Sequence, residues 1–433
     1  MSQKKFAIYL FVFWMMQLST VVWAQMPVME WTRLLGTTGH DVGGDVSIDE
    51  SGNVYVTGNT SGSLGGSNEG FADMFLAKYD ADGAKLWTRQ FGTADGDNSR
   101  GLAVDVNGDV YVTGYSGGDG SPVDMFLIKF DADGAELWSR QLGSTNSGVC
   151  YGVSADSEGN VYITGSAYGA LDGNTSAGGC DIFLMKYDMD GSRQWTRQWG
   201  TTYYEYGDGV SVDTNGNVYV TGSTRGQFDS SASAGNADMF LTKYDTDGVM
   251  QWTSQLHRNV YDFSSNVSVD GDGNAYVTGV TSDGDRDIYL AKYDTDGIMQ
   301  WITQLGTVDS DSSRDLSIDE SGNVFVTGIT NGDLDGNSNT GGCDLFLTKY
   351  YMDGTKRWTW QLGTVYDDGG IGVSVDGVGN AYITGYTCGD LNDNDNAGGS
   401  DMFLVKISNV PELSSVSMLI GFVLAALVQR RRW

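Results

Sequence analysis

A four-residue string, Tyr/Phe-Val/Ile-Thr-Gly, constrains the fold of this chain more than any other feature. It occurs seven times, beginning at Tyr55, Tyr111, Tyr162, Tyr219, Tyr276, Phe325 and Tyr382. Successive copies are 49 to 57 residues apart. A regular period of this length is typical of a ring or array built from one supersecondary unit. The repeat region therefore forms one domain rather than the two or three that the length of 433 residues alone suggests.

Each repeat contains four short segments that favour β-strands. In the second repeat they span residues 101–105, 110–114, 124–131 and 137–142. They are rich in Val, Tyr, Phe, Thr and Trp, and turns that contain Asp and Gly separate them. No stretch of the repeats shows a helical period. The sequence thus predicts an all-β fold, a seven-bladed β-propeller over residues 30–408 with four antiparallel strands per blade.

The two ends of the repeat region predict how the ring closes. The region begins with a lone tryptophan strand at residues 31–36 and ends after only three strands, the last at 401–407. Seven complete blades result only if the first strand pairs with the last three. We therefore expect a 3+1 closure, in which the N-terminal strand completes the last blade.

The repeats resemble the SBBP family of bacterial β-propeller repeats over nearly the whole of residues 30–408. The resemblance rests on the Tyr-Val-Thr-Gly string, on a second string Asp-x-Phe/Tyr-Leu-x-Lys that begins at Asp73, and on a strand that contains Trp87. All three recur in each repeat, with the tryptophan strand of the last repeat supplied by the start of the chain. The resemblance implies that the strand ending in aspartate, such as 101–105, is innermost and the tryptophan strand outermost. Residues present in every blade are expected to be structural, so a functional site should break the symmetry.

Charge and composition exclude several classes of function. The chain has 25 Lys+Arg against 56 Asp+Glu, a formal net charge of −31. We expect no nucleic-acid partner, because such a body repels phosphate backbones. There are only two histidines, His40 and His257, too few for a histidine site in each blade. Four cysteines are too few for a disulfide scaffold, although export would permit the pairs Cys150–Cys180 and Cys343–Cys388, with free thiols as the alternative.

Both ends of the chain contain predicted targeting segments. Residues 1–24 have the basic start, apolar stretch and small residue before a cleavage site of a signal peptide. Residues 409–433 combine Pro411-Glu412, an apolar segment at 418–428 expected to be a hydrophobic helix, and a basic end, Arg430, Arg431 and Arg432. This segment resembles the PEP-CTERM sorting tail, although Leu413 stands where that motif usually has proline. The alternative is a plain membrane anchor.

The sorting-tail resemblance implies a partner and a location. The partner is an exosortase-like sorting enzyme, and the tail would meet the membrane at least until it is processed. Such proteins are often linked to extracellular polysaccharide. We therefore expect an exported protein of the envelope, cell surface or extracellular matrix of a bacterium, and a polysaccharide or a cell-surface protein as its partner.

One set of loops breaks the repeat symmetry with aromatic and acidic residues. In a four-stranded blade, the loop into the first strand and the loop between the second and third strands lie on one face, here called the top face. Aromatic rings there could stack on pyranose faces while carboxylates accept sugar hydroxyls. A solvated, irregular rim is the alternative. The candidate ligand-binding residues are Tyr203, Tyr204, Glu205, Tyr206, Tyr261, Asp262, Tyr366, Asp367 and Asp368.

Two loops between second and third strands have the spacing of calcium ligands. Oxygen-bearing side chains stand at alternate positions, a pattern that can supply Ca²⁺ with several ligands. The alternative is ordinary Asp/Asn/Gly turn chemistry, and no other cofactor is expected. The candidate ligands are Asp333, Asp335, Asn337 and Asp344 in one loop, and Asp390, Asn392, Asn394 and Asp401 in the other.

Three functions remain open from the sequence. The first is a non-catalytic surface or matrix propeller that binds a glycan, cation or protein through its top-face loops. The second is an enzyme, because the string at residues 78–87 resembles the tryptophan-docking motif of quinoprotein propellers. Those enzymes commonly have eight blades and adjacent cysteines, which this chain lacks. The third is a structural matrix component without a specific ligand. We expect a protein that is not an enzyme.

Overall fold

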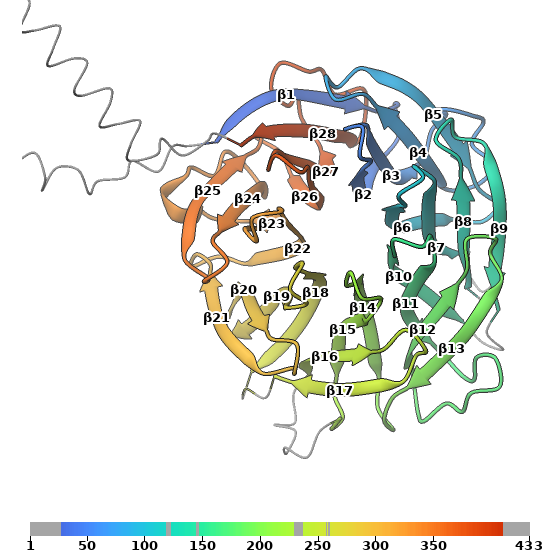
Figure 1. The fold of residues 1–433 in the computed structure, drawn as a ribbon. Helices are drawn as coiled ribbons and strands as arrows, with labels where there is room; N and C mark the ends of the chain where they lie inside the picture. Colours follow the sequence, from blue (N-terminus) through green and yellow to red (C-terminus); the bar gives the residue numbers. More distant parts are fainter. Residues whose placement is uncertain are drawn as a thin grey trace, which may run out of the picture. The chain divides into compact units, whose positions relative to one another are not determined.

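The computed structural model describes residues 27–117, 123–143, 147–228, 237–256, 258 and 260–409, except for the side chain of Asp283. Seven separate four-stranded antiparallel sheets surround a central channel (Figure 1). The predicted seven-bladed β-propeller is confirmed. Met29–Ser408 forms one compact unit.

The blades follow one another along the chain. Blade 1 contains β2 (Asp41–Ile48), β3 (Val54–Thr60), β4 (Asp73–Tyr79) and β5 (Lys85–Phe91). Blade 2 contains β6 (Asp97–Val104), β7 (Val110–Ser116), β8 (Asp124–Phe130) and β9 (Glu136–Leu142). Blade 3 contains β10 (Gly148–Ala155), β11 (Val161–Ala167), β12 (Asp181–Tyr187) and β13 (Arg193–Trp199). Blade 4 contains β14 (Glu205–Val212), β15 (Val218–Thr224), β16 (Asp238–Tyr244) and β17 (Met250–Gln255).

The remaining blades have the same plan. Blade 5 contains β18 (Tyr261–Val269), β19 (Ala275–Asp283), β20 (Asp285–Tyr293) and β21 (Met299–Leu305). Blade 6 contains β22 (Asp311–Ile318), β23 (Val324–Thr330), the short 3₁₀ turn η1 (Leu334–Gly336), β24 (Asp344–Tyr350) and β25 (Lys356–Leu362). Blade 7 contains β26 (Asp368–Val375), β27 (Ala381–Thr387), β28 (Asp401–Ser408) and the first strand of the chain, β1 (Val28–Leu35).

Closure of the ring follows the predicted 3+1 arrangement. The strand order of blade 7 is β1-β28-β27-β26, so the N-terminal strand lies beside the last one (Figure 1). An ion pair of 3.0 Å joins Glu30 on β1 to Lys406 on β28. The side-chain amide of Asn392 also donates a hydrogen bond of 3.1 Å to the hydroxyl of Thr32. The last strand, β28, is therefore covered by β1 and does not form the outer edge of blade 7.

Strand order within the blades also agrees with the sequence. The strands that end in aspartate, such as β6, lie next to the channel, and the tryptophan strands, such as β9, form the outer wall (Figure 1). Bridges join Ala72 to Gly96 and Cys180 to Tyr204, so the two loop sets expected on the top face do meet there.

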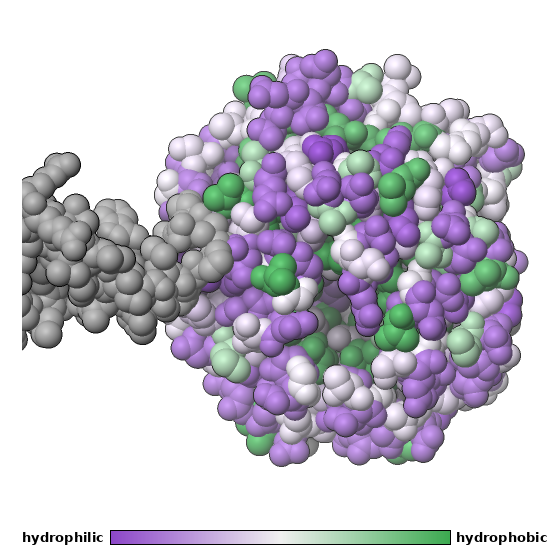
Figure 2. All heavy atoms as spheres, turned by 45° about the horizontal axis from the view of Figure 1, so that its top comes forward, coloured by the Kyte–Doolittle hydropathy of each residue, from purple (hydrophilic) through white to green (hydrophobic). Residues whose placement is uncertain are grey.

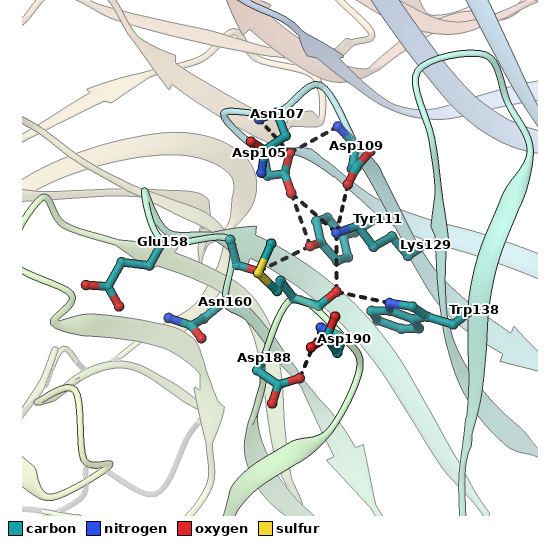
Figure 3. Close-up of polar contacts among 12 residues, drawn as sticks. Asp105, Asn107, Asp109, Tyr111, Lys129, Trp138, Glu158, Asn160, Asp188 and Asp190 are labelled. Carbon is teal, nitrogen blue, oxygen red and sulfur yellow. Dashed lines mark hydrogen bonds and ion pairs between the residues drawn. The ribbon is translucent and has the colours of Figure 1, made fainter.

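A repeated polar cluster holds each blade together, and blade 2 is representative (Figure 3). The ring of Tyr111 is fully buried, and its hydroxyl donates to Asp105 at 3.2 Å. The ammonium of Lys129 lies 4.9 Å from the centre of this ring and forms an ion pair with Asp109 at 2.9 Å. Trp138 packs edge-on against Tyr111 with ring centres 6.0 Å apart. The residues shared by all blades thus specify the fold, as expected from their repetition.

The same cluster also binds to the next blade through hydrogen bonds. Lys129 and Trp138 both donate hydrogen bonds to the carbonyl oxygen of Met189, which lies in the turn between β12 and β13. In that turn Gly191 has a φ of 75° and lies against the indole of Trp138. A side chain at Gly191 would be 2.8 Å from the indole, so only glycine allows this approach.

The predicted targeting segments lie outside the described residues. They comprise the signal peptide at 1–24 and nearly all of the sorting segment, including Pro411, Glu412, Arg430, Arg431 and Arg432. Within the described part of the chain, no helix has the length and apolar character needed to span a membrane.

Candidate ligand-binding site

A channel with a volume of about 350 Å³ runs into the centre of the ring. Residues from the inner strands of all seven blades line it. Figure 2 shows the hollow at the middle of a mostly hydrophilic surface, with apolar side chains at several points of its border. A concave site of this kind, shared by every blade, is where propeller loops of different sequence can act on one ligand.

A β-bulge in each inner strand supplies one extra residue to the channel wall. In β6, for example, the pairing with β7 shifts between Ser99 and Gly101 and leaves Arg100 as the additional residue. Equivalent shifts occur in every other blade. From blade 1 to blade 7 the extra residues are Gly44, Arg100, Tyr151, Asp208, Ser265, Arg314 and Ile371, and all seven line the channel. Bulges are common where a side chain must be directed toward a functional site.

The channel therefore breaks the symmetry that the rest of the fold keeps. Two of its seven bulge residues are arginines in a protein with a net charge of −31. Burial lowers the pKa of Arg314, and the positive charges of Arg100 and Arg286 lower it further. Arg100 donates a hydrogen bond of 3.1 Å to the hydroxyl of Tyr115. This wall can take an acidic or hydroxyl-rich group.

Three carboxyl groups line the same channel, and burial raises the pKa of each. Burial raises the pKa of Asp208 to about 7, and its carboxylate accepts a hydrogen bond of 2.9 Å from Ser264. Burial likewise raises the pKa of Asp315 to about 6. The pKa of Asp45 lies well above its usual range because of burial and, second, because of the charge of Asp315. Asp45 accepts the backbone N–H of Leu102 in the next blade at 2.8 Å, so it also joins two blades.

Exposed aromatic residues gather on the top face of blades 3, 4 and 5. Tyr168 and Tyr204 pack edge-on with ring centres 6.5 Å apart, and Tyr261 stacks on Phe263 at 6.2 Å. Tyr203 is 56 % exposed, and Tyr206 is also exposed. On blade 7, Tyr366 and Asp367 are exposed as well. The predicted aromatic part of the rim is therefore on the surface.

The structure corrects the placement of the three other predicted rim residues. Glu205, Asp262 and Asp368 are fully buried and begin the inner strands of their blades. Asp368 accepts hydrogen bonds of 2.6 and 2.8 Å from the backbone N–H and hydroxyl of Thr364. Glu205 accepts the same two bonds from Thr201. These acids fold the entry loops and do not face the solvent.

A repeated string could have revealed this role. Gly-Thr followed, after three intervening residues, by Asp or Glu occurs at 36–41, 92–97, 200–205, 306–311 and 363–368. In blade 5 the threonine is replaced by Arg258, whose Nε donates to Asp262 at 3.0 Å. An acid that recurs in this way belongs to the blade. The residues that vary, three positions after it, line the channel, and sequence reasoning missed them.

The two predicted calcium loops do not gather their oxygen atoms around one point. Asp335 pairs with Lys356 and accepts the hydroxyl of Thr359, whereas Asp344 accepts Gln361 Nε2 at 2.9 Å. Asn337 uses its amide to donate to the carbonyl oxygen of Leu334 at 2.8 Å. In the described part of the chain no three Asp, Glu, His or Cys side chains form a metal-sized group.

The second of these loops uses its side chains in the same way. Asn394 donates to the carbonyl oxygen of Leu391 at 3.1 Å, and Asp390 accepts the N–H of Asn396 at 2.9 Å. Asn392 is tied to Thr32, and Asp401 accepts the N–H of Ala397 at 2.7 Å. Leu334 and Leu391 are fully buried. The turn chemistry considered as the alternative describes both loops.

The cysteines and the described histidine complete the search for reactive groups. All four cysteines are free thiols, so neither predicted disulfide is formed. Burial raises the pKa of Cys150 and of Cys180 to about 12, which leaves both thiols protonated and unreactive. His40 Nδ1 lies 3.2 Å from the hydroxyl of Ser400, but that serine is 94 % buried, with a relative exposure of 6 %. His257 is outside the described residues.

The fold and this channel define a β-propeller. Six SBBP repeats are detected in it: the family model described as a beta-propeller repeat matches residues 30–65, 86–120, 137–171, 194–229, 251–285 and 300–335. Each match runs from an outer strand through the inner and second strands of the next blade. The resemblance to SBBP repeats stated from the sequence is thus confirmed.

Two curated relatives match part of the chain. Regulatory protein FlaEY of Caulobacter vibrioides is 28% identical over 201 residues, which are 40% of this chain and 21% of that protein. An uncharacterized WD repeat-containing protein of Acanthamoeba polyphaga mimivirus is 27% identical over 176 residues, 31% of this chain and 13% of that protein. The chain therefore spans only a small part of either relative.

Solved structures of similar shape are distant in sequence. A protein of unknown function from Dyadobacter fermentans has a TM-score of 0.48 at 12% identity, covering 89% of this chain and 99% of that chain. Puromycin hydrolase has a TM-score of 0.48 at 14% identity over 82% of this chain and 50% of that chain. The Pan2 WD40 domain of Neurospora crassa has a TM-score of 0.45 at 9% identity over 86% and 90%. At these values no argument about function rests on them.

Proposed function

We propose that this protein is an exported, non-catalytic binding protein of the bacterial envelope or extracellular matrix, and that it holds a glycan at the channel mouth on its top face. The observation that carries the proposal is the group of exposed aromatic rings on three neighbouring blades, 3 to 5. Aromatic faces combine apolar area with little loss of conformational entropy, which suits the stacking of sugar rings.

The channel adds polar specificity to this surface. Arg100, Tyr151 and Arg314 line it with donors, and Ser265 adds a hydroxyl group. These groups can hydrogen-bond to sugar hydroxyls or to an acidic substituent. An extended polymer would then contact the aromatic residues along its length and place one unit over the channel.

Export and sorting are part of this proposal. The leader at 1–24 and the tail at 409–433 support it, and an exosortase-like enzyme would act on the tail. The enzyme alternative has weaker support. The hydroxyl of Ser400 is buried beside His40, and among the described residues no carboxylate hydrogen-bonds to the imidazole.

The test is binding of the full-length protein to the host's own extracellular polysaccharide. We expect the double variant Tyr204→Ala/Tyr206→Ala to lose most of the binding. The matched control is Phe71→Ala, because Phe71 is 81 % exposed on the top-face loop of blade 1, on another part of the ring. Equal binding by the double variant and the native protein would refute the proposed surface. Absence of binding by the native protein would refute the glycan.

A further inference from the structure

Pairs of acidic residues lie at the junctions between neighbouring blades on the top face. One member begins a third strand and the other begins the inner strand of the next blade. The backbone N–H of Asp97 donates to the carbonyl oxygen of Ala72 at 2.8 Å, which brings Asp97 beside Asp73. The same bond joins Asp41 to Ser400 at 2.7 Å, beside Asp401. The pairs are Asp73–Asp97, Asp181–Glu205, Asp238–Asp262, Asp287–Asp311, Asp344–Asp368 and Asp401–Asp41.

In two of these junctions the two carboxylates converge on one small space. A Cβ atom placed on Gly92 would be 2.7 Å from Asp73 Oδ1 and 2.8 Å from Asp97 Oδ2. Gly200 has the same relation to Asp181 and Glu205. This glycine is the first residue of the repeated Gly-Thr string. Its missing side chain leaves room between the two acids.

Several carboxylate oxygens in these pairs are buried without a hydrogen-bond partner. They are Asp41 Oδ1, Asp73 Oδ1, Asp181 Oδ1, Asp368 Oδ1 and Asp401 Oδ1. All five residues are at most 1 % exposed. In the Gly92 and Gly200 junctions the unpartnered oxygen is the one that points to the space shared with the other acid. Buried anionic oxygens that face one another are costly unless a positive charge lies between them.

Two junctions show how the chain behaves when the pair is altered. Between blades 4 and 5, the guanidinium of Arg258 forms an ion pair with Asp262, so a cationic side chain supplies the positive charge. Between blades 2 and 3 the second acid is replaced by Gly148, and the remaining Asp124 is exposed. At the junction of blades 5 and 6, Asp287 is only half-buried. The remaining four junctions keep both buried acids, and among the described residues no Lys or Arg forms an ion pair with them.

We propose that the two junctions built from Asp73–Asp97 and Asp181–Glu205 each bind a divalent cation, with Ca²⁺ as the best match. The donors are oxygen atoms only: two carboxylates, with threonine hydroxyls and backbone carbonyls beside them. Hard oxygen donors of mixed type select Ca²⁺ rather than a thiophilic or imidazole-binding metal. These sites differ from the two loops at Asp333 and Asp390, and they do not depend on the proposed glycan function.

A charge-matched set of variants tests the sites in the full-length protein. Bound Ca²⁺ is measured by elemental analysis after dialysis in trace Ca²⁺, and thermal unfolding is followed with Ca²⁺ and with chelator. We expect Ca²⁺ to raise the Tm, and Asp181→Asn to lose about one equivalent of Ca²⁺ per chain. The controls are Asp133→Asn, an exposed turn residue, and Asp390→Asn in the earlier candidate loop. Both should keep all the bound Ca²⁺.

A second variant separates loss of the metal from loss of folding. Thr93→Arg copies the arrangement of Arg258 and Asp262 at the junction of blades 1 and 2. It should lose about one equivalent of Ca²⁺ and unfold at a Tm that no longer falls as far in chelator. The inference is overturned if the native protein binds no Ca²⁺ and its Tm is the same in Ca²⁺ and in chelator. It is also overturned if Asp181→Asn and Thr93→Arg keep the full complement.

Discussion

The guanidinium of Arg140 on β9 reaches the next blade and donates a hydrogen bond of 2.7 Å to the carbonyl oxygen of Gly191. It also donates to the carbonyl of Asp190 at 3.2 Å, and it lies 5.0 Å from the ring centre of Trp138. Arg33, Arg89 and Arg197 make the same contact at three other junctions. In blade 4 the equivalent position on the outer strand is Ser254.

Replacing this arginine should weaken the junction between blades 2 and 3. Arg140→Ala removes two hydrogen bonds to carbonyls, and we expect the free energy of unfolding to fall by about 1–2 kcal/mol. Arg140→Lys should recover little of this stability, because a lysine ammonium cannot reproduce the forked N–H donors of the guanidinium. The reverse change, Ser254→Arg, should raise stability. Chemical denaturation measures all three, and equal stability of Arg140→Ala and native protein would contradict the interpretation.

Glycine at position 191 is required for two separate reasons that can be measured apart. Gly191→Ala places a methyl group in a left-handed conformation and 2.8 Å from the indole of Trp138. Gly173 has a similar φ of 80° but has no atom within 4 Å of its would-be Cβ. We expect Gly173→Ala to cost about 1 kcal/mol and Gly191→Ala about 3 kcal/mol. Similar losses in both variants would show that the contact with Trp138 adds nothing.

The arginines of the channel should destabilise the protein when no ligand is bound. Arg314→Gln removes a partly desolvated charge that is repelled by Arg100 and Arg286. We therefore expect a higher Tm than in the native protein, with a difference that shrinks as salt increases. The control is Arg193→Gln, because Arg193 is surface-exposed and paired with Asp172. A Tm below that of the native protein would mean that Arg314 stabilises the empty channel.

The pH dependence of stability should report on Asp208. Its pKa is about 7 in the folded protein against 3.8 normally, so the folded state binds this proton more tightly than the unfolded state. The contribution to stability is present below pH about 4 and is lost as the pH rises toward 7. Asp208→Asn should flatten this decline between about pH 4 and 7, since the amide does not titrate. Unfolding at several pH values measures it, and an unchanged slope would contradict the assignment.

Most of the fold could be predicted because the same pattern of strands and turns occurs in seven repeats. A period near 50 residues, the number of strands in each repeat, and the unmatched strand at 31–36 were enough to derive the ring and its closure. The tryptophans, lysines and threonines that recur could be recognised as structural for the same reason. Their repetition in every blade is enough to distinguish these structural residues from residues of a functional site.

The lining of the channel could not be predicted in the same way. A bulge shifts the register by one residue, and in β6 the shift makes Arg100 a channel residue although simple alternation does not single it out. The burial of Glu205 and Asp368 was also missed, because carboxylates near loops are usually solvated. Their hydrogen bonds to Thr201 and Thr364 became evident only once the loops were seen to fold back on the strand.

The closure of blade 7 also decides where a force on the two ends of the propeller would act. β1 starts and β28 ends side by side, where Glu30 meets Lys406, and Lys406 also contacts Ala81 in the turn between β4 and β5. That turn lies on the face opposite the top-face loops, so both ends of the propeller leave from there. The two ends of the propeller and its top-face loops thus lie on opposite faces of the ring. Tension on the two termini would then load the β1–β28 hydrogen bonds, the seam that closes the ring.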